Sequence, residues 1–193
     1  MPELVLEAKM KQQNSYKEYY PPHIYQDETI YFITARTIDR IKFFNTKIKK
    51  EILVKCLAET IINYKIKIYA YVILSNHYHL LIKIQNKFWL PKFIKSFHGK
   101  SAILINKTEN ISARKIWINY FDRCIRSKKD FWTRFNYIHN NPIKHGYIKN
   151  PESLNQYRFS SYNQWIKKNG AEWMASCFTQ YPVIDFTCEN DLD

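Results

Sequence analysis

The stretch KIYAYVILSNHYHLLIKI, residues 67–84, decides the fold expected for this chain. Residues 67–74 and 77–84 are rich in β-branched and aromatic side chains, a composition that favours two β-strands. Ser75 and Asn76 lie between them and are typical of a tight turn. The stretch therefore predicts an antiparallel hairpin.

The second strand of this hairpin carries two of the six histidines of the chain, His77 and His79. Alternate side chains of a strand point to the same face, so both imidazoles are expected to project together. The apolar side chains between and beyond them are expected on the opposite face; they are Tyr78, Leu80, Ile82 and Ile84. A pair of half-buried histidines within a sheet and a pair of metal ligands are both open interpretations.

The other segments alternate between strand-like and helix-like patterns. The residues predict further strands at 29–37 and 116–125, and helices at 46–64, 90–106 and 129–141. Pro142 is expected to end the last helix. The fold class is therefore α/β (α+β), with an antiparallel sheet of four to five strands and helices mainly on one face.

The length of 193 residues, with 46% hydrophobic residues, predicts one main domain with extensions. We expect a flexible N-terminal arm at 1–20, a domain at 21–165, and a C-terminal tail of unknown role at 166–193. No apolar run is long enough to cross a membrane, and the N-terminus lacks a signal-peptide pattern. A cytoplasmic protein with reduced cysteines and no membrane partner is expected.

The charge of the chain points to a polyanionic partner. Thirty Lys and Arg against seventeen Asp and Glu give a formal net charge of +13. Basic and aromatic residues interleave at 86–100 and 128–147, a mixture suited to phosphate contacts and base stacking. Nucleic acid is the expected partner, although a lysine-rich surface over an aromatic core would give the same composition.

The segment YIHNNP, residues 137–142, supplies further candidate site residues. Tyr137 and Asn141 are four residues apart, so they share one face of the predicted helix. If this face lies over the histidine strand, the Asn141 carbonyl can join His77 and His79 as a third ligand, beside Tyr137 as a nucleophile. Such a site, with open positions for water and phosphate, suits Mg²⁺ or Mn²⁺. Ordinary packing of the tyrosine and an ordinary Asn-Pro helix end remain alternatives.

At these residues the sequence resembles a known family. LSNHYHLLI (74–82) is similar to the histidine strand of the HUH single-strand DNA transposases, an insertion-sequence family. YIHNNPIKHGYI (137–148) is similar to the nucleophile helix of their REP-associated tyrosine transposase branch. The resemblance extends over about residues 20–162. The combination of H-x-H and Y-I-x-x-N-P, in this order and spacing, is specific.

The resemblance implies both a fold and an activity. It implies a ferredoxin-like, RRM-like palm that cleaves and transfers single-stranded DNA marked by a hairpin, through a covalent 5′-phosphotyrosine intermediate. His77, His79 and Asn141 would hold a divalent metal ion, Mg²⁺ or Mn²⁺, and Tyr137 would be the catalytic nucleophile. A monomer is favoured for this branch, and a dimer is possible.

Other classes of protein fit less well. A histidine-triad hydrolase needs a third histidine where this chain has Leu81, and a cupin would have more than three glycines. The serious alternative is a domesticated DNA-binding protein with the same fold and no transposition activity. The complete set of two histidines, tyrosine and asparagine favours an enzyme.

Overall fold

A computed structural model describes residues 23–186. The strands are β1 (Thr29–Thr37), β2 (Lys67–Ile73), β3 (His77–Ile84) and β4 (Trp117–Cys124). The α-helices are α2 (Lys47–Asn63), α3 (Trp89–Thr108), α4 (Lys128–Lys144), α5 (Tyr162–Asn169) and α6 (Ala171–Gln180), and 3-10 turns occupy Ile38–Arg40 and Pro151–Gln156. The arm expected at 1–20 lies outside the described residues, so its structure stays a prediction.

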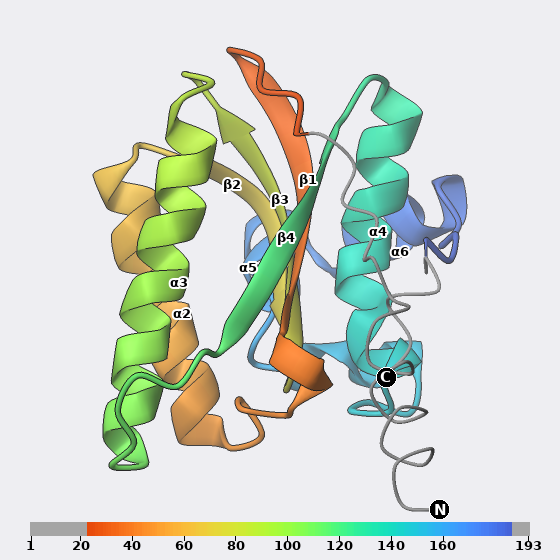
Figure 1. Cartoon of the computed structure of the whole chain (residues 1–193). Helices are drawn as coiled ribbons and strands as arrows, with labels where there is room; N and C mark the ends of the chain where they lie inside the picture. The colour runs from red at the N-terminus through yellow and green to blue at the C-terminus, as the bar shows by residue number, and fades with distance from the viewer. Residues whose placement is uncertain (1–22, 187–193) are drawn as a thin grey trace, which may run out of the picture.

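The four strands form one antiparallel sheet in the order β2-β3-β1-β4. With α2 between β1 and β2 and α3 between β3 and β4, this is a ferredoxin-like arrangement (Figure 1). The expected mixed fold with an antiparallel sheet is confirmed. The predicted hairpin is present too, with β2 paired to β3 and the Leu74 amide donating to the His77 carbonyl at 2.9 Å.

The two faces of β3 separate as its alternation predicts. Tyr78, Leu80 and Ile82 lie in the core between the sheet and helices α2 and α3. Leu81 belongs to a second core on the other face, together with Phe135 and Ile138 of α4. Because β3 pairs with both β1 and β2, its backbone is held on both edges. His77 and His79, which share the face of Leu81, therefore lie on a central strand whose backbone is paired on both sides.

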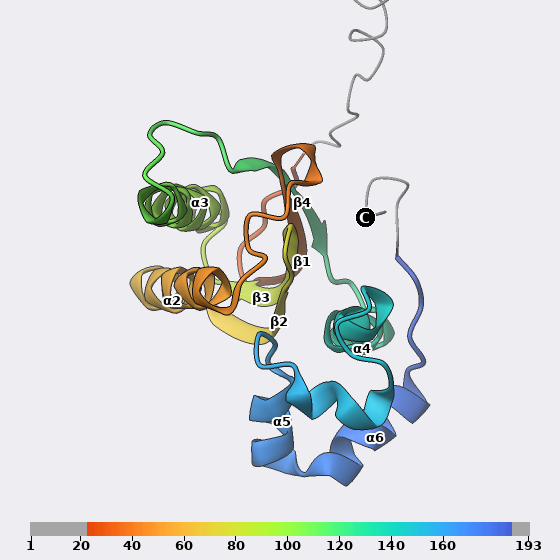
Figure 2. The same ribbon diagram turned by 90° about the horizontal axis from the view of Figure 1, so that it is seen from below.

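The helices cover both faces of the sheet, whereas the sequence predicted helices mainly on one face. Figure 2 shows α2 and α3 on one side of the sheet, α4 and α6 on the other, and α5 next to the β2 edge. The difference arises because the second face also carries apolar side chains, such as Val72 and Leu81, which α4 buries. Helix α4 packs on β2 and β3, so the second face is not left bare for nucleic acid.

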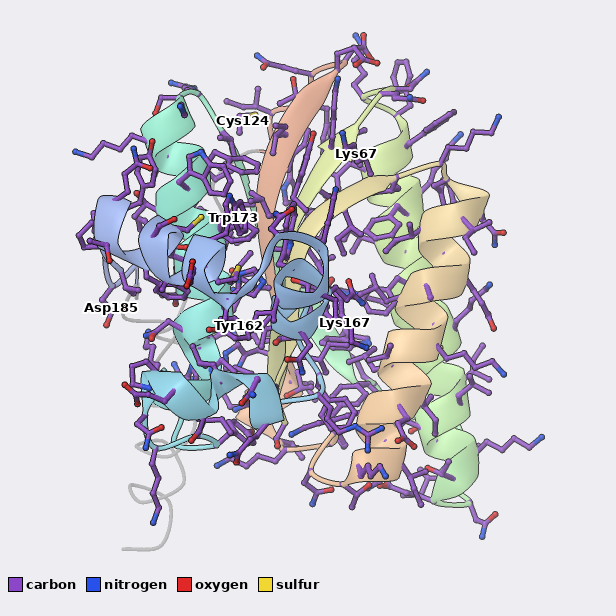
Figure 3. The ribbon with its side chains drawn as sticks, turned by 180° about the vertical axis from the view of Figure 1, so that it is seen from behind. Lys67, Cys124, Tyr162, Lys167, Trp173 and Asp185 are labelled. Carbon is purple, nitrogen blue, oxygen red and sulfur yellow. The ribbon has the colours of Figure 1, made fainter. Side chains whose placement is uncertain are left out.

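Helices α5 and α6 pack behind α4, and Figure 3 labels Tyr162 and Trp173 in this layer. The rings of Trp165 and Trp173 stack with centroids 5.4 Å apart. The Asn136 amide of α4 donates to the carbonyls of Cys177 and Tyr181, at 2.7 Å each. The described part of the predicted 166–193 tail therefore packs against α4.

Helix α4 does not end at Pro142, as the sequence predicted, but continues to Lys144. A proline inside a helix removes one donor, and its ring presses on the preceding turn. Here the Pro142 carbonyl accepts from the amides of both Tyr147 and Ile148, at 2.8 and 3.1 Å, so the following loop closes over the distorted turn. Among the described residues, no helix has the length and apolar character needed to span a membrane.

Candidate active site between β3 and α4

His77 and His79 project together from β3, as predicted, with ring centroids 5.2 Å apart. A polar neighbour holds the Nδ1 atom of each ring. Nδ1 of His77 lies 2.7 Å from Oδ1 of Asn76, and Nδ1 of His79 lies 2.7 Å from Oγ1 of Thr34. Since Asn76 Oδ1 can only accept, His77 carries its proton on Nδ1 and its lone pair on Nε2. Partners at Nδ1 are the usual way in which proteins orient imidazole ligands toward a metal.

Asn141 meets the histidine pair from α4. Its amide nitrogen donates to the Tyr137 carbonyl at 2.8 Å, which directs its Oδ1 atom the other way. Within residues 23–186, neither Asn141 Oδ1 nor His79 Nε2 has a hydrogen-bond partner, although both atoms are buried. The Asn141 side chain nevertheless interacts electrostatically with His79 and favours its protonated form. Two buried polar atoms without hydrogen-bond partners are thus close together, and burying such atoms unpaired is costly.

Tyr137 lies beside this pair on the same side of α4. Its ring meets the His79 ring edge-on with centroids 5.3 Å apart, and only 2% of the residue is exposed. Its hydroxyl accepts a hydrogen bond from the Lys144 ammonium at 3.3 Å. The structure therefore brings all four predicted site residues together.

Burial and nearby charge govern protonation here. Burial is the main cause that holds the pKa of His79 well below its ordinary value, and positive charge at His77, His145 and Lys144 adds to it. His79 is therefore neutral at pH 7. Burial also opposes the charge on Lys144, but its hydrogen bonds to Asp185 and Tyr137 outweigh burial and raise the pKa of Lys144. A neutral imidazole and a permanent ammonium thus flank the Tyr137 ring.

A pocket of about 300 Å³ opens beside the Tyr137 side chain. Its walls are residues of α4 and of the segment after α6; they are Tyr137, Asn140, Asn141, Lys144, Val183 and Asp185. Asp185 accepts from Lys144 at 2.8 Å, and Phe186 meets the Tyr137 ring edge-on at 5.3 Å. The segment that follows α6 therefore contributes one wall of the pocket.

Lys144 and His145 are the site residues that the sequence reasoning missed. The His145 ring lies 4.7 Å from the His77 ring, and Lys144 contacts the Tyr137 hydroxyl. Positions seven and eight residues after Tyr137 return to its face after two helical turns. This signal was present in the sequence, but it was not usable as long as the helix was expected to stop at Pro142.

The donor set fits a hard or borderline divalent cation better than a structural zinc. No cluster of three or more His, Cys, Asp or Glu side chains within residues 23–186 is arranged to hold a metal ion. His77 and His79 supply two imidazoles, and the third donor is the uncharged carbonyl of Asn141. Two nitrogens and one amide oxygen leave positions for phosphate and water, as Mn²⁺ and Mg²⁺ sites commonly do. The unpartnered atoms of His79 and Asn141 support such a site.

Comparison with known families decides the relationship of the chain. The family model described as "Transposase IS200 like" matches residues 25–141, more than half of the chain. The chain belongs to the IS200-like transposase family. The matched residues run from the segment before β1 to Asn141, so they include all four predicted site residues.

Individual relatives of this IS200-like transposase agree with that assignment. A protein of Haemophilus influenzae named as a REP-associated tyrosine transposase is 27% identical over 154 residues, covering 72% of this chain and 82% of the relative. The structure of a REP-associated tyrosine transposase bound to a REP hairpin matches with a TM-score of 0.67 at 17% identity, over 88% of this chain and 94% of that chain. The resemblance found in the sequence is confirmed, and so is the fold.

A further structure, of a Deinococcus radiodurans protein described as a transposase, gives a TM-score of 0.44. Its identity is 16%, and the match covers 68% of this chain and 96% of that chain. This score is too low to support a statement about the fold. The REP-associated branch therefore supplies the useful comparisons.

Proposed function

We propose that this IS200-like transposase cleaves and transfers single-stranded DNA through a covalent bond to Tyr137. His77, His79 and Asn141 hold a divalent cation, Mg²⁺ or Mn²⁺, beside that tyrosine. The observation that carries the proposal is the pair of buried polar atoms without hydrogen-bond partners, His79 Nε2 and Asn141 Oδ1, next to the Tyr137 ring. Such atoms are rare in folded proteins unless a ligand completes them.

The covalent step proceeds at the phenolic oxygen of Tyr137. This oxygen attacks the phosphorus, the bond from phosphorus to the 3′ oxygen breaks, and a 5′-phosphotyrosine and a 3′-hydroxyl result. The phenol proton passes to solvent, and the 3′ oxygen takes up a proton. Because the phosphoester is conserved, a second 3′-hydroxyl can reverse the step, and strand transfer needs no nucleotide cofactor.

Lys144 is the group that makes the tyrosine reactive. A free phenol has a pKa near 10 and is a weak nucleophile at neutral pH. The Lys144 ammonium, 3.3 Å from the phenolic oxygen, stabilises the phenolate by charge and by donating a hydrogen bond. The cation, when bound, supplies positive charge that stabilises the phosphate oxygens during the transfer.

The DNA partner follows from charge and from family. A net charge of +13 favours a polyanion, and a REP-associated tyrosine transposase of the same fold has been solved bound to a REP hairpin. We expect this chain to bind single-stranded DNA that forms a hairpin. The scissile phosphate then lies in the unpaired strand beside the hairpin, within reach of Tyr137.

The test is covalent capture of a hairpin oligonucleotide with single-stranded flanks, in the presence of Mn²⁺. We expect an SDS-resistant adduct that mass spectrometry maps to Tyr137. Tyr137→Phe should abolish the adduct and leave binding of the oligonucleotide within about twofold, since only the nucleophilic oxygen is removed. Tyr69→Phe is the matched control, because Tyr69 is a half-buried tyrosine of β2 outside the site, and it should form the adduct normally.

Two results would contradict the proposal. An adduct on another tyrosine would show that Tyr137 is not the nucleophile. Tight binding without any adduct, across Mn²⁺, Mg²⁺ and several hairpins, would instead support the domesticated DNA-binding protein.

A further inference from the structure

Strand β4 carries two exposed side chains directly beside the candidate site. In the antiparallel pair of β1 and β4, Phe121 is opposite Thr34 and Arg123 is opposite Phe32. Directly opposed residues of such a pair point to the same face of the sheet. Thr34 bonds His79, and Phe32 stacks on the His79 ring with centroids 5.5 Å apart. Phe121 and Arg123 therefore extend the site face outward by one strand.

This part of the sheet is open among the described elements. Helix α4 packs on β2 and β3, and Figure 2 shows no described helix over β4 on that side. Phe121 is 39% exposed, although Phe32 on the neighbouring strand is buried. The opposite face of β4 is covered instead, where the His23 ring stacks on Tyr120 at 4.5 Å.

A single exposed phenylalanine is common on protein surfaces and carries no meaning by itself. The charge around Phe121 adds the second observation. Arg123, two residues along the same face, is exposed and forms no ion pair with a carboxylate of residues 23–186. It is close enough to the Arg134 guanidinium for the two charges to repel each other. Asp130 pairs with Arg134 and balances one of these charges.

An aromatic ring beside an excess of positive charge fits one class of ligand, a flexible single strand of nucleic acid. Bases stack on exposed aromatic rings whatever their sequence, and guanidinium groups contact the phosphates between them. A double helix cannot use Phe121 in this way, because its bases are already stacked. An acidic peptide would use Arg123 but would gain little from the ring.

We propose that Phe121 and Arg123 form a platform that stacks an unpaired base of the DNA strand leading to Tyr137 and holds its phosphate. This inference rests on the proposed function for the direction in which the strand leads, but binding to the platform needs no cleavage. Such a platform would hold an unpaired DNA strand in one fixed position beside Tyr137.

The test measures binding in the full-length Tyr137→Phe protein, so that no covalent step contributes. Fluorescence anisotropy compares a blunt hairpin with the same hairpin carrying single-stranded flanks. Phe121→Ala should weaken binding of the flanked hairpin about tenfold, and leave binding of the blunt hairpin unchanged. Phe121→Trp should retain the affinity, because it preserves a stacking surface.

Phe88→Ala is the matched control. Phe88 is 65% exposed and precedes α3, on the side of the sheet away from the site, and a lysine lies next to it in sequence. This variant should bind both oligonucleotides as the parent does. Arg123→Gln should reduce the slope of log affinity against log salt by about 0.7, the value for one phosphate contact to a single strand.

A cross-linking experiment places the base directly. Oligonucleotides with 5-iodouracil at each unpaired position in turn should cross-link to the Phe121 peptide from one or two adjacent positions only. The platform is refuted if Phe121→Ala behaves like Phe88→Ala, or if it weakens the blunt and flanked hairpins equally. Loss of the adduct with Tyr137→Phe but not with Tyr69→Phe tests the cleavage proposal separately, so the two ideas can fail independently.

Discussion

Both faces of the sheet carry a histidine packed among aromatic rings, but the hydrogen bonds of the two histidines differ. On the α2 and α3 face, His98 is stacked on Trp117 with centroids 4.5 Å apart, and its Nε2 atom bonds the Tyr78 hydroxyl at 2.8 Å. On the α4 face, His79 is 1% exposed, yet its Nε2 atom has no hydrogen-bond partner among the described residues. A satisfied ring stabilises the core, whereas an unsatisfied one is prepared for a ligand that comes from outside.

The contrast is sharper because the unpartnered atoms gather on one face. The buried side-chain atoms without partners within residues 23–186 are His79 Nε2, Asn136 Oδ1, His139 Nδ1 and Asn141 Oδ1, and none belongs to the core under α2 and α3. Of these, His79 and Asn141 interact with each other and flank Tyr137. Leaving these atoms unpaired costs free energy, which indicates a site where a bound ligand supplies the missing interactions.

The largest expected effect comes from replacing a histidine of each face with alanine. His79→Ala should lower the affinity for Mn²⁺ by more than about 100-fold, because even changes behind a ligand cost 10–100-fold. The free energy of unfolding without metal should fall as well, because the deleted ring leaves a cavity and an unpaired Thr34 hydroxyl, so the affinity for Mn²⁺ is the measurement that separates the two faces. Calorimetric titration with Mn²⁺ and denaturant unfolding measure the two effects.

His98→Ala is the matched comparison on the other face. It should leave Mn²⁺ affinity unchanged and lower the free energy of unfolding by about 3 kcal/mol, from the cavity and the unpaired Tyr78 hydroxyl. If both variants lose stability alike and neither affects Mn²⁺, the distinction between the two faces is wrong.

The next largest effect is expected from replacing Lys144, which donates a hydrogen bond to the Tyr137 hydroxyl. Lys144→Met keeps the length of the side chain and removes the charge beside the Tyr137 oxygen. The rate of adduct formation should fall about 10- to 100-fold at neutral pH, the range for one charge-assisted hydrogen bond. A pH profile of adduct formation separates this role from a structural one.

In that profile, the rate rises with pH as the Tyr137 phenol loses its proton. This rise should shift to higher pH in Lys144→Met, because the phenolate loses its stabilising charge. Lys144→Arg should restore most of the rate. A lower rate with an unshifted profile would mean that Lys144 only supports the position of α4. Lys149→Met, an exposed lysine after α4, is the control and should have no effect.

The sequence was informative wherever local pattern determines structure. Strands β1 and β3 begin and end at the predicted residues, because both are runs rich in β-branched and aromatic side chains. Thr46 caps α2 as expected, with its hydroxyl accepting from the Lys49 amide. The pairing of His77 with His79 followed from alternation alone.

The rest depended on contacts that no local pattern contains. Helix α4 continues through Pro142 to Lys144, and the loop beyond it donates two hydrogen bonds to the Pro142 carbonyl; this brings Lys144 and His145 to the site face. Helices α5 and α6 were not predicted; they span only eight and ten residues, and the stacking of Trp165 on Trp173 joins them. Helices α5 and α6 and the last turn of α4 are thus the parts that tertiary packing decides.

The smallest expected effect is a dependence of stability on pH that the two faces share. Burial lowers the pKa of His98 and the pKa of His139 to about 3 each, and one lies on each side of the sheet. Between pH 6.5 and 3, the unfolded chain binds protons that the folded chain cannot, so the free energy of unfolding falls as pH decreases. Each histidine should contribute about 1 kcal/mol per pH unit in that window.

Denaturant unfolding at pH 7.5, 6.0 and 5.0 measures this slope. His139→Gln should flatten it by the share of one histidine, because glutamine can still reach Ser161, which bonds His139 at 2.8 Å, but does not titrate. Saturating Mn²⁺ should make stability depend more steeply on pH, since a cation bound to neutral His79 is released when His79 is protonated. The contribution of His98 to the pH dependence should be the same with and without Mn²⁺. If the free energy of unfolding does not depend on pH, or if Mn²⁺ does not change that dependence, the proposed difference between His98 and His79 is wrong.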